Sequence, residues 1–194
     1  EYTYTGNAII PDYTVTVDGV SLVKGKDYKE TVTYNTNVGE ATLKVTGMGE
    51  YDTTSVVKKF NIVAANISDL TVESKKGQIV YDGTQHIGNS TTNNLTIKLG
   101  DKVFDAANFI IYYPTDKTSN INAGNGTVTL KPAKNNKNFV GEKEFTFAID
   151  PAELTGTLSV YDKNGTKLTN IESTAFEYDG TAHEFAKVVF APSS

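Results

Sequence analysis

The two histidines, His86 and His183, are the first residues to consider for chemistry. Each lies four residues after an Asp, Asp82 or Asp179, in two copies of one motif. A metal site needs two or three further ligands beside each His, and this spacing in a strand-turn segment does not ensure that the side chains converge. A His beside a hairpin that bonds the backbone or solvent explains both positions, so we expect no metal here.

Acidic residues offer no specific site either, although glycoside hydrolysis uses two carboxylates roughly 5 to 10 Å apart. A chain with 23 Asp and Glu residues contains many formal pairs, among them Asp101 with Asp105 and Glu142 with Glu144. The run 162–165 resembles a calcium loop in composition but lacks the twelve-residue spacing with a terminal Glu, and a turn explains it. There is no nucleophile elbow. We predict that the chain is not an enzyme and uses no cofactor.

Tyrosines are the best ligand-contact candidates. Tyr112 and Tyr113 are adjacent, so in a strand one of them must face outward. An exposed Tyr can stack on a sugar, or it can pair with a cross-strand neighbour. Both interpretations stay open, and we name the two residues as candidate contacts.

Composition excludes several partners. The 194 residues include no Cys, Trp or Arg, and the net charge is −5. Without Cys there are no disulfides or Cys-based zinc sites, and an acidic chain without Arg is a poor partner for nucleic acid. No apolar run approaches the roughly 20 residues that span a bilayer, so we expect no membrane insertion.

An isopeptide crosslink between Lys and Asn or Asp would need a carboxylate buried beside them, and it stays open.

The elements that position these residues follow an internal repeat. A Tyr-Thr-Gly or Tyr-Asp-Gly motif occurs three times, at Tyr4 with Gly6, then at Tyr81-Asp82-Gly83, then at Tyr178-Asp179-Gly180. Blocks after the first motif recur in the same order after the second, for example 37–45 with 122–130 and Phe60-Asn61-Ile62 with Phe147-Ala148-Ile149. We therefore predict a first repeat at 1–64, a second at 65–150 and a partial third at 151–194.

The first repeat begins at its motif, whereas the second carries residues 67–78 before it and the third carries 154–175. Two explanations are open for the missing strands. Either the ends are boundaries within a longer protein, or a neighbouring chain supplies strands by adding to a sheet edge.

Local patterns predict β-structure almost throughout. Alternating runs rich in Thr, Val, Ile and aromatic residues favour half-buried strands, and turn residues separate them, as at Asp18-Gly19, which indicates a hairpin. Residues 102–108 predict at most one helical turn. The predicted strands are Thr14–Val17, Glu30–Tyr34, Ala41–Thr46, Val56–Val63, Leu70–Val72, Gln78–Tyr81, Leu95–Leu99, Phe109–Tyr113, Thr127–Leu130 and Glu144–Ile149. We expect an all-β fold of small tandem antiparallel sandwiches, Ig-like or similar, with very little helix.

The first repeat resembles a repeat of large secreted proteins from Gram-positive gut and rumen bacteria. The shared features are a Tyr-Thr-Gly, a Pro, a Val-x-Val run followed by Asp-Gly, Leu-x-x-Gly-x-Asp-Tyr, a Tyr followed by Asn, and a Gly-x-Gly-x-Tyr ending. They are found here at Tyr4–Gly6, Pro11, Val15–Gly19, Leu22–Tyr28, Tyr34-Asn35 and Gly47–Tyr51. The second and third repeats look like the related Tyr-Asp-Gly type, sometimes grouped with MBG domains. The second departs from the motif, with Asn108-Phe109 in place of Asp-Tyr and 132–134 in place of Gly-x-Gly.

The resemblance implies a bacterial extracellular protein, secreted or attached to the cell surface, in which these units are Ig-like spacers. Its glycines and aromatics would be structural, at turns with positive φ and in cores, and it carries over no catalytic residue. The leading hypothesis is a non-enzymatic spacer or display segment of an adhesin, stalk or fibre. The alternatives are a carbohydrate-binding module of a multimodular enzyme and a filament subunit completed by strand exchange. The expected partners are neighbouring domains of the same chain, with host or plant glycans or protein receptors as further candidates.

Overall fold

The protein consists of two compact units, Glu1–Pro151 and Ala152–Ser194. A computed structural model describes residues 1–169, 180 and 185–192. The structure is mostly β, with 46% strand and 8% helix arranged as several small sheets. The prediction of a β-rich fold with little helix is therefore confirmed.

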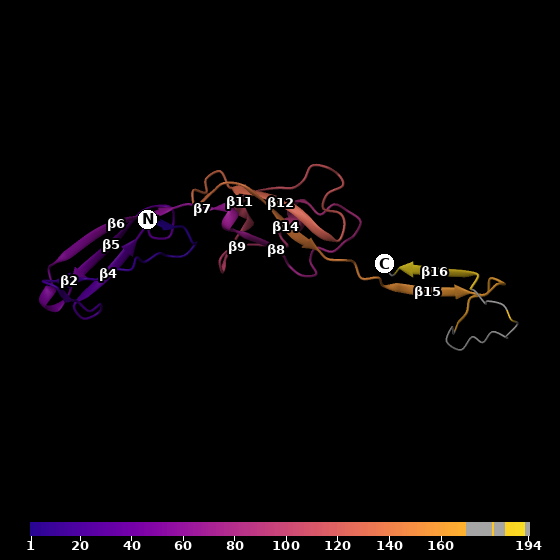
Figure 1. Ribbon diagram of the computed structural model, residues 1–194, viewed down its shortest axis with the longest axis horizontal. Coiled ribbons are helices and arrows are strands. Elements are labelled where there is room, and N and C mark those ends of the chain that lie inside the picture. Colours follow the sequence, from indigo (N-terminus) through magenta and orange to yellow (C-terminus); the bar gives the residue numbers. More distant parts are fainter. Residues whose placement is uncertain (170–179, 181–184, 193–194) are drawn as a thin grey trace. The chain divides into compact units, whose positions relative to one another are not determined.

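The first repeat is built on one four-stranded sheet with the order β1-β6-β5-β4 (Figure 1). Strands β4, β5 and β6 are antiparallel, and β1 runs parallel to β6. A small hairpin, β2–β3, turns at Asp18 and Gly19, which have φ values of 50° and 81°, as a type I′ turn requires. The elements are β1 (Tyr2–Thr3), β2 (Thr16–Val17), β3 (Val20–Ser21), β4 (Tyr28–Thr33), β5 (Gly39–Gly47), η1 (Gly49–Tyr51) and β6 (Ser55–Val63).

The second repeat contains two three-stranded sheets, β11-β12-β14 and β10-β9-β8, and strand β8 packs against β14. The parallel pair β13–β7 joins the end of this repeat to its beginning. Its elements are β7 (Ala65–Asn66), η2 (Ile67–Asp69), β8 (Thr71–Ser74), α1 (Gly88–Thr92), β9 (Leu95–Leu99), β10 (Lys102–Phe104), η3 (Ala106–Asn108), β11 (Phe109–Tyr112), β12 (Gly124–Pro132), β13 (Phe139–Val140) and β14 (Lys143–Ile149).

The backbone bonds of the first repeat recur in the second. In both, the motif Tyr donates its amide at the end of the last strand, over 2.8 Å from Tyr4 N to Val63 O, the last residue of β6, and over 2.8 Å from Tyr81 N to Asp150 O, just after β14. The central strand also has the same register, because Gly39 lies opposite Ile62 just as Gly124 lies opposite Ile149. Strands β4, β5 and β6 thus correspond to β11, β12 and β14, and the hairpin β2–β3 corresponds to β9–β10.

A continuous hydrophobic core runs through Glu1–Pro151. Alternate residues of the central and last strands point into it, as period-two burial requires, and Leu130, Val128 and Ile149 are at most 2% exposed. Tyr4 from the first repeat belongs to the same cluster. The two repeats therefore share one core.

Aromatic side chains form the contact between these repeats. Phe139 is 3% exposed, and its ring centroid lies 5.3 Å from that of Tyr4 and 5.2 Å from that of Phe104. Gly6 is at this contact, with φ of 79°, and a Cβ there would approach the Phe104 ring to 2.6 Å. Only glycine meets both conditions. Burial raises the pKa of Tyr4.

The second unit is described as one antiparallel pair, β15 (Gly156–Tyr161) with β16 (Lys187–Pro192). Leu158 lies opposite Phe190 and Val160 lies opposite Val188, so these four side chains share one face. Leu158 and Val188 are 57% and 56% exposed. Tyr178, Asp179 and His183 lie outside the described residues, whereas Gly180 is described and has φ of 77°.

Some predictions need refinement. Residues 102–108 form strand β10 and then the single helical turn η3, which agrees with the prediction of at most one turn. Helix α1 was not expected from its Gly-Asn-Ser-Thr-Thr sequence. It forms because Thr91 is 2% exposed and Asn94 donates its side-chain amide to Ser90 O over 3.0 Å. The expected strand 78–81 is reduced to a parallel bridge between Val80 and Asp150.

Candidate ligand-contact site

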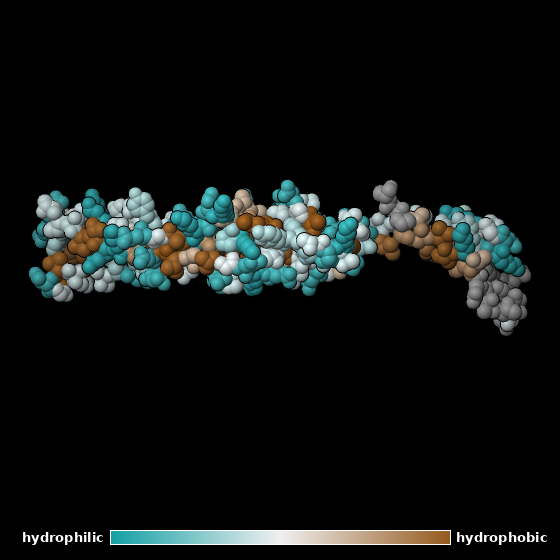
Figure 2. Space-filling model, turned by 90° about the horizontal axis from the view of Figure 1, so that it is seen from above, coloured by the Kyte–Doolittle hydropathy of each residue, from teal (hydrophilic) through white to brown (hydrophobic). Residues whose placement is uncertain are grey.

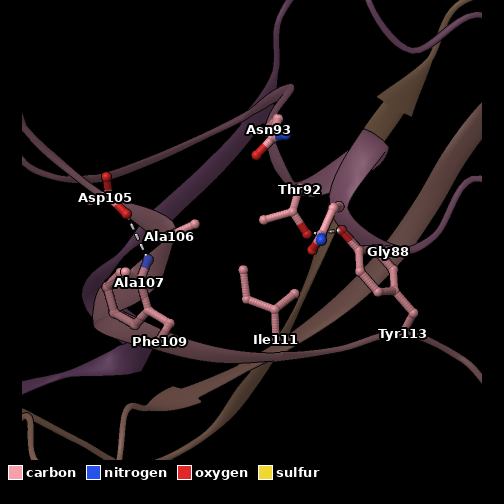
Figure 3. A pocket seen from close by; sticks show the side chains of 10 residues that line it. Gly88, Thr92, Asn93, Asp105, Ala106, Ala107, Phe109, Ile111 and Tyr113 are labelled. Carbon is pink, nitrogen blue, oxygen red and sulfur yellow. Dashed lines mark hydrogen bonds between the residues drawn. The ribbon is translucent and has the colours of Figure 1, made fainter.

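A surface hollow in the second repeat is the best candidate for a ligand site. It has a volume of about 550 Å³ and lies between α1, η3 and β11 (Figure 3). Its lining residues are Gly88, Asn89, Thr92, Asn93, Asp105, Ala106, Ala107, Phe109, Ile111 and Tyr113.

The apolar side of the hollow comes from one edge strand. Phe109 and Ile111 alternate on one face of β11, and Tyr113 continues this pattern just past the strand end. Phe109 is buried, and Ile111 and Tyr113 pack against the core as half-buried side chains. Figure 3 shows Ile111 directed toward the open middle of the hollow, with Thr92 facing it from the helix. The strand thus presents an apolar floor to whatever enters.

Hydroxyl and carboxylate groups fix the rim. The hydroxyls of Thr92 and Tyr113 lie 2.9 Å apart and share a hydrogen bond. Burial raises the pKa of Tyr113, although its bond to Thr92 acts in the opposite direction. Asp105 Oδ1 accepts from Ala107 N over 2.8 Å and caps η3. This Asp105 oxygen therefore holds the loop in place.

The exposed amides of Asn89 and Asn93 complete the rim. Amides, a hydroxyl pair and one carboxylate around an apolar floor suit a neutral ligand that both donates and accepts hydrogen bonds, such as a sugar. Among the described residues, no group of three or more His, Asp or Glu side chains is placed to hold a metal ion.

The two candidate tyrosines lie on opposite faces, and only Tyr113 lines the hollow. Tyr112 is 47% exposed, and Lys131 Nζ lies 5.3 Å from the centroid of its ring. Lys131 also pairs with Glu142 over 2.7 Å, which raises the pKa of Lys131. The outward Tyr112 thus has a cross-strand cation–π partner, and the two rings do not form one platform.

His86 occupies a structural position. Its side chain is only 13% exposed, and its Nε2 atom lies 3.7 Å from Asp82 Oδ1, which is too long for a hydrogen bond. Its backbone amide donates to Asn120 O over 2.8 Å, just as the Ile9 amide donates to Asn35 O in the first repeat. Ile9, the equivalent residue of the first repeat, is aliphatic, so we infer that the side chain of His86 serves packing.

The motif at 81–84 is a turn stabilised by its own Asp. Asp82 Oδ1 accepts from the hydroxyl and the amide of Thr84, and these bonds lower the pKa of Asp82. Gly83 has φ of 78°, the conformation that the resemblance implied. Tyr81 is 41% exposed, whereas Tyr4 is 8% exposed because the second repeat covers it.

The Asp/Asn-rich run 162–165, a candidate calcium loop by composition, forms a turn. Asp162 Oδ1 accepts from the amides of Asn164 and Thr166, over 2.9 and 2.8 Å, so the run 162–165 is a turn in the described structure.

None of the 18 lysines, all of which are described, is buried. The structure therefore offers no buried Lys for an isopeptide bond.

Asn138, in the polar run 134–138, is a contact residue between the first two repeats. Its Oδ1 accepts from Val38 N over 2.9 Å, and its Nδ2 donates to Asn37 Oδ1 over 3.0 Å. Its backbone oxygen accepts from Ala65 N over 3.0 Å. A polar loop of Lys and Asn residues gives no signal of such a role except its difference between the repeats.

The chain matches no known protein-family profile and no curated protein sequence. Within the described part of the chain, no helix is long and apolar enough to cross a membrane.

Proposed function

We propose that this chain is a non-enzymatic structural segment that spaces or displays other modules of a large bacterial protein, either secreted or attached to the cell surface. The observation that carries the proposal is the contact between the first two repeats. Tyr4, Phe104 and Phe139 pack there with little exposure, and Asn138 adds hydrogen bonds to the first repeat. Repeats joined by such a contact act as a stiff rod segment.

The extracellular setting is supported by the resemblance of the first repeat to bacterial secreted repeats. Strand β8 of one sheet packs against β14 of the other in the second repeat, and we infer an Ig-like sandwich from this contact. The filament alternative belongs to the same structural class. Neighbouring modules of the same chain are the proposed partners.

Nuclear magnetic relaxation tests this proposal. We expect the amides of residues 1–64 and 65–150 to report one common rotational correlation time. The double variant Tyr4→Ala with Asn138→Ala removes the aromatic contact and the amide bonds, and we expect the two repeats to tumble separately. Tyr34→Ala is the control, because Tyr34 is 83% exposed. Independent tumbling of the wild-type repeats contradicts the proposal, as does turnover of a glycan or peptide that is lost on one carboxylate substitution.

A second candidate function is carbohydrate binding, favoured by the hollow that Tyr113 lines. Titration calorimetry against starch, xylan, cellulose and mucin glycans tests it. Asn93→Ala removes a rim amide, so we expect at least a roughly tenfold loss of affinity for any glycan that binds there. Tyr112→Ala is the matched control, because Tyr112 faces away from the hollow. No heat across the panel, or an equal loss in both variants, contradicts this candidate.

A further inference from the structure

One face of the sheet formed by β4, β5 and β6 carries a regular array of lysines and hydroxyls. Residues directly opposite one another on antiparallel strands share a face, and the register places three rows side by side here. The rows are Lys29 with Thr46 and Ser55, Thr31 with Lys44 and Val57, and Thr33 with Thr42 and Lys59. Apart from Val57, every member of this array is a lysine or a hydroxyl residue.

The lysines of the array lie on one diagonal. Lys29, Lys44 and Lys59 come from three neighbouring strands, and all three are exposed. Each step of the diagonal crosses one strand and advances two residues, so neighbouring lysine Cα atoms are roughly 8 Å apart. Lys59 pairs with Glu40 over 2.6 Å, and no described carboxylate forms an ion pair with Lys29 or Lys44. This face therefore concentrates positive charge on a chain whose net charge is −5.

The corresponding face of the second repeat is open as well, with Ile110 and Tyr112 of β11 39% and 47% exposed. Chain lies on both sides of that repeat in the sequence, so the openness of this face belongs to the repeat itself. Its chemistry differs, because Lys131 is paired there with Glu142. The residues in the places of the three diagonal lysines are uncharged, namely Ile110, Thr129 and Thr146. The sheet thus forms without a lysine diagonal.

We propose that this face of the first repeat binds an acidic polysaccharide, a sugar chain whose carboxylate or sulfate groups recur along its length. The lysine ammonium groups supply charge-assisted hydrogen bonds to such anions. The threonine and serine hydroxyls both donate to and accept from the hydroxyls of sugars. The array offers these two kinds of contact side by side, as a polysaccharide with both groups requires.

The position of the array favours a polysaccharide over a peptide. A bound peptide strand gains its main-chain hydrogen bonds at a sheet edge, whereas the array is centred on β5, which already pairs with β4 and β6. Protein interfaces also have an apolar centre, and Val57 is the one apolar member here. In the view of Figure 2, hydrophilic and intermediate residues cover most of the first repeat, at the left. Nucleic acid is disfavoured because the chain has no Arg.

This surface is different from the hollow that Tyr113 lines, whose rim suits a neutral sugar. Binding of a polysaccharide here goes beyond the proposed spacer function, since a segment without any glycan ligand still serves as a spacer. Failure of the binding test therefore leaves the relaxation test unaffected.

Titration calorimetry against polygalacturonate, which carries carboxylates, and dextran sulfate, which carries sulfates, tests the proposal. We expect binding of at least one polymer, with an affinity that falls as added salt screens the lysines. Lys44→Gln removes the central charge of the diagonal, so we expect an affinity at least about fivefold lower. Lys58→Gln is the matched control, because Lys58 is exposed on β6 but lies opposite Leu43 on the other face of the sheet. Circular dichroism verifies that both variants are folded.

Three further probes separate the possible ligand classes. Uncharged dextran is expected to bind more weakly than dextran sulfate, and poly-L-glutamate and duplex DNA more weakly than the acidic polysaccharides. A wild-type chain that binds neither acidic polysaccharide overturns the proposal, as does an equal loss of affinity in Lys44→Gln and Lys58→Gln. Equal binding of uncharged dextran overturns the role of charge. Tighter binding of poly-L-glutamate or DNA overturns the polysaccharide as the ligand.

Discussion

At the scale of single residues, the buried Asn120 holds a loop of the second repeat in place. Asn120 is 7% exposed and has φ of 57°. Its side chain donates to Thr127 O over 2.9 Å and accepts from Thr127 N over 2.8 Å, which ties the loop to β12. Asn suits this place because its short amide tolerates positive φ and supplies both a donor and an acceptor.

We expect Asn120→Ala to lower the free energy of unfolding by roughly 1–3 kcal/mol, because it leaves backbone groups of Thr127 without partners. Urea denaturation measures the change. Asn93→Ala is the control, since the Asn93 side chain is exposed on the rim of the hollow. Equal stability of the two variants would contradict the role of Asn120.

Asp116 has a depressed pKa, caused first by the hydroxyl of Ser119 and then by the hydroxyl and amide of Thr118 and the amide of Ser119. A carboxylate with a folded pKa below its unfolded value stabilises the fold above the unfolded pKa, and this contribution is lost as pH falls through the folded pKa. We expect Ser119→Ala to raise the pKa of Asp116, as followed by carboxyl-carbon NMR titration. Ser68→Ala, far along the chain, leaves it unchanged, and an unaltered titration in Ser119→Ala would refute the assignment.

At the scale of elements, the turn after β5 requires a residue without a side chain. A Cβ at Gly47 would lie 1.9 Å from Tyr51 O, a backbone atom that cannot move away. Tyr51 belongs to η1, and Thr54 donates its hydroxyl to the same Tyr51 oxygen over 2.6 Å. The close return of the chain therefore depends on Gly47.

We expect Gly47→Ala to cost about 1–3 kcal/mol of stability, since crowding against backbone forces a local shift. Gly25→Ala is the comparison. Its site is open but has φ of 84°, so it costs roughly 1 kcal/mol from strain alone. Thermal unfolding of both variants provides the measurement, and a smaller effect at Gly47 would argue against the close contact.

At the scale of the whole molecule, the shared core makes the first two repeats one cooperative body. Phe139 contacts Tyr4 from the first repeat and Phe104 from the second. Loss of such a ring removes packing from both repeats at once. Residues Ala152–Ser194 form the second compact unit.

We expect Phe139→Ala to destabilise Glu1–Pro151 by about 3–5 kcal/mol, because it opens a cavity in the shared core. We expect one calorimetric transition for the two repeats of the wild-type chain and a broadened or split transition in the Phe139→Ala variant. Val140→Ala, next to it on the same strand but 50% exposed, serves as the control. An unchanged transition in Phe139→Ala would mean that the repeats do not share a core.

Several elements followed from local pattern alone. The runs 95–99 and 144–149 alternate apolar and polar residues, and Asp18-Gly19 requires positive φ, so strands and hairpin were predictable within a residue or two. Helix α1 was not, because its sequence has low helical propensity and its stability comes from burial of Thr91. Of the residues that line the hollow, sequence analysis had named only Tyr113 as a candidate ligand contact.

The amino-acid sequence by itself determined the β-class, the positions of the longer alternating strands and the motif turns, because alternation and glycine conformation act over a few neighbouring residues. Tertiary structure alone decided that Tyr113 lines the hollow while Tyr112 pairs with Lys131. It also decided that Asn138 joins two repeats. These outcomes depend on which distant strands pack together, and packing energy arises from contacts between residues up to about a hundred positions apart, such as Val38 and Asn138.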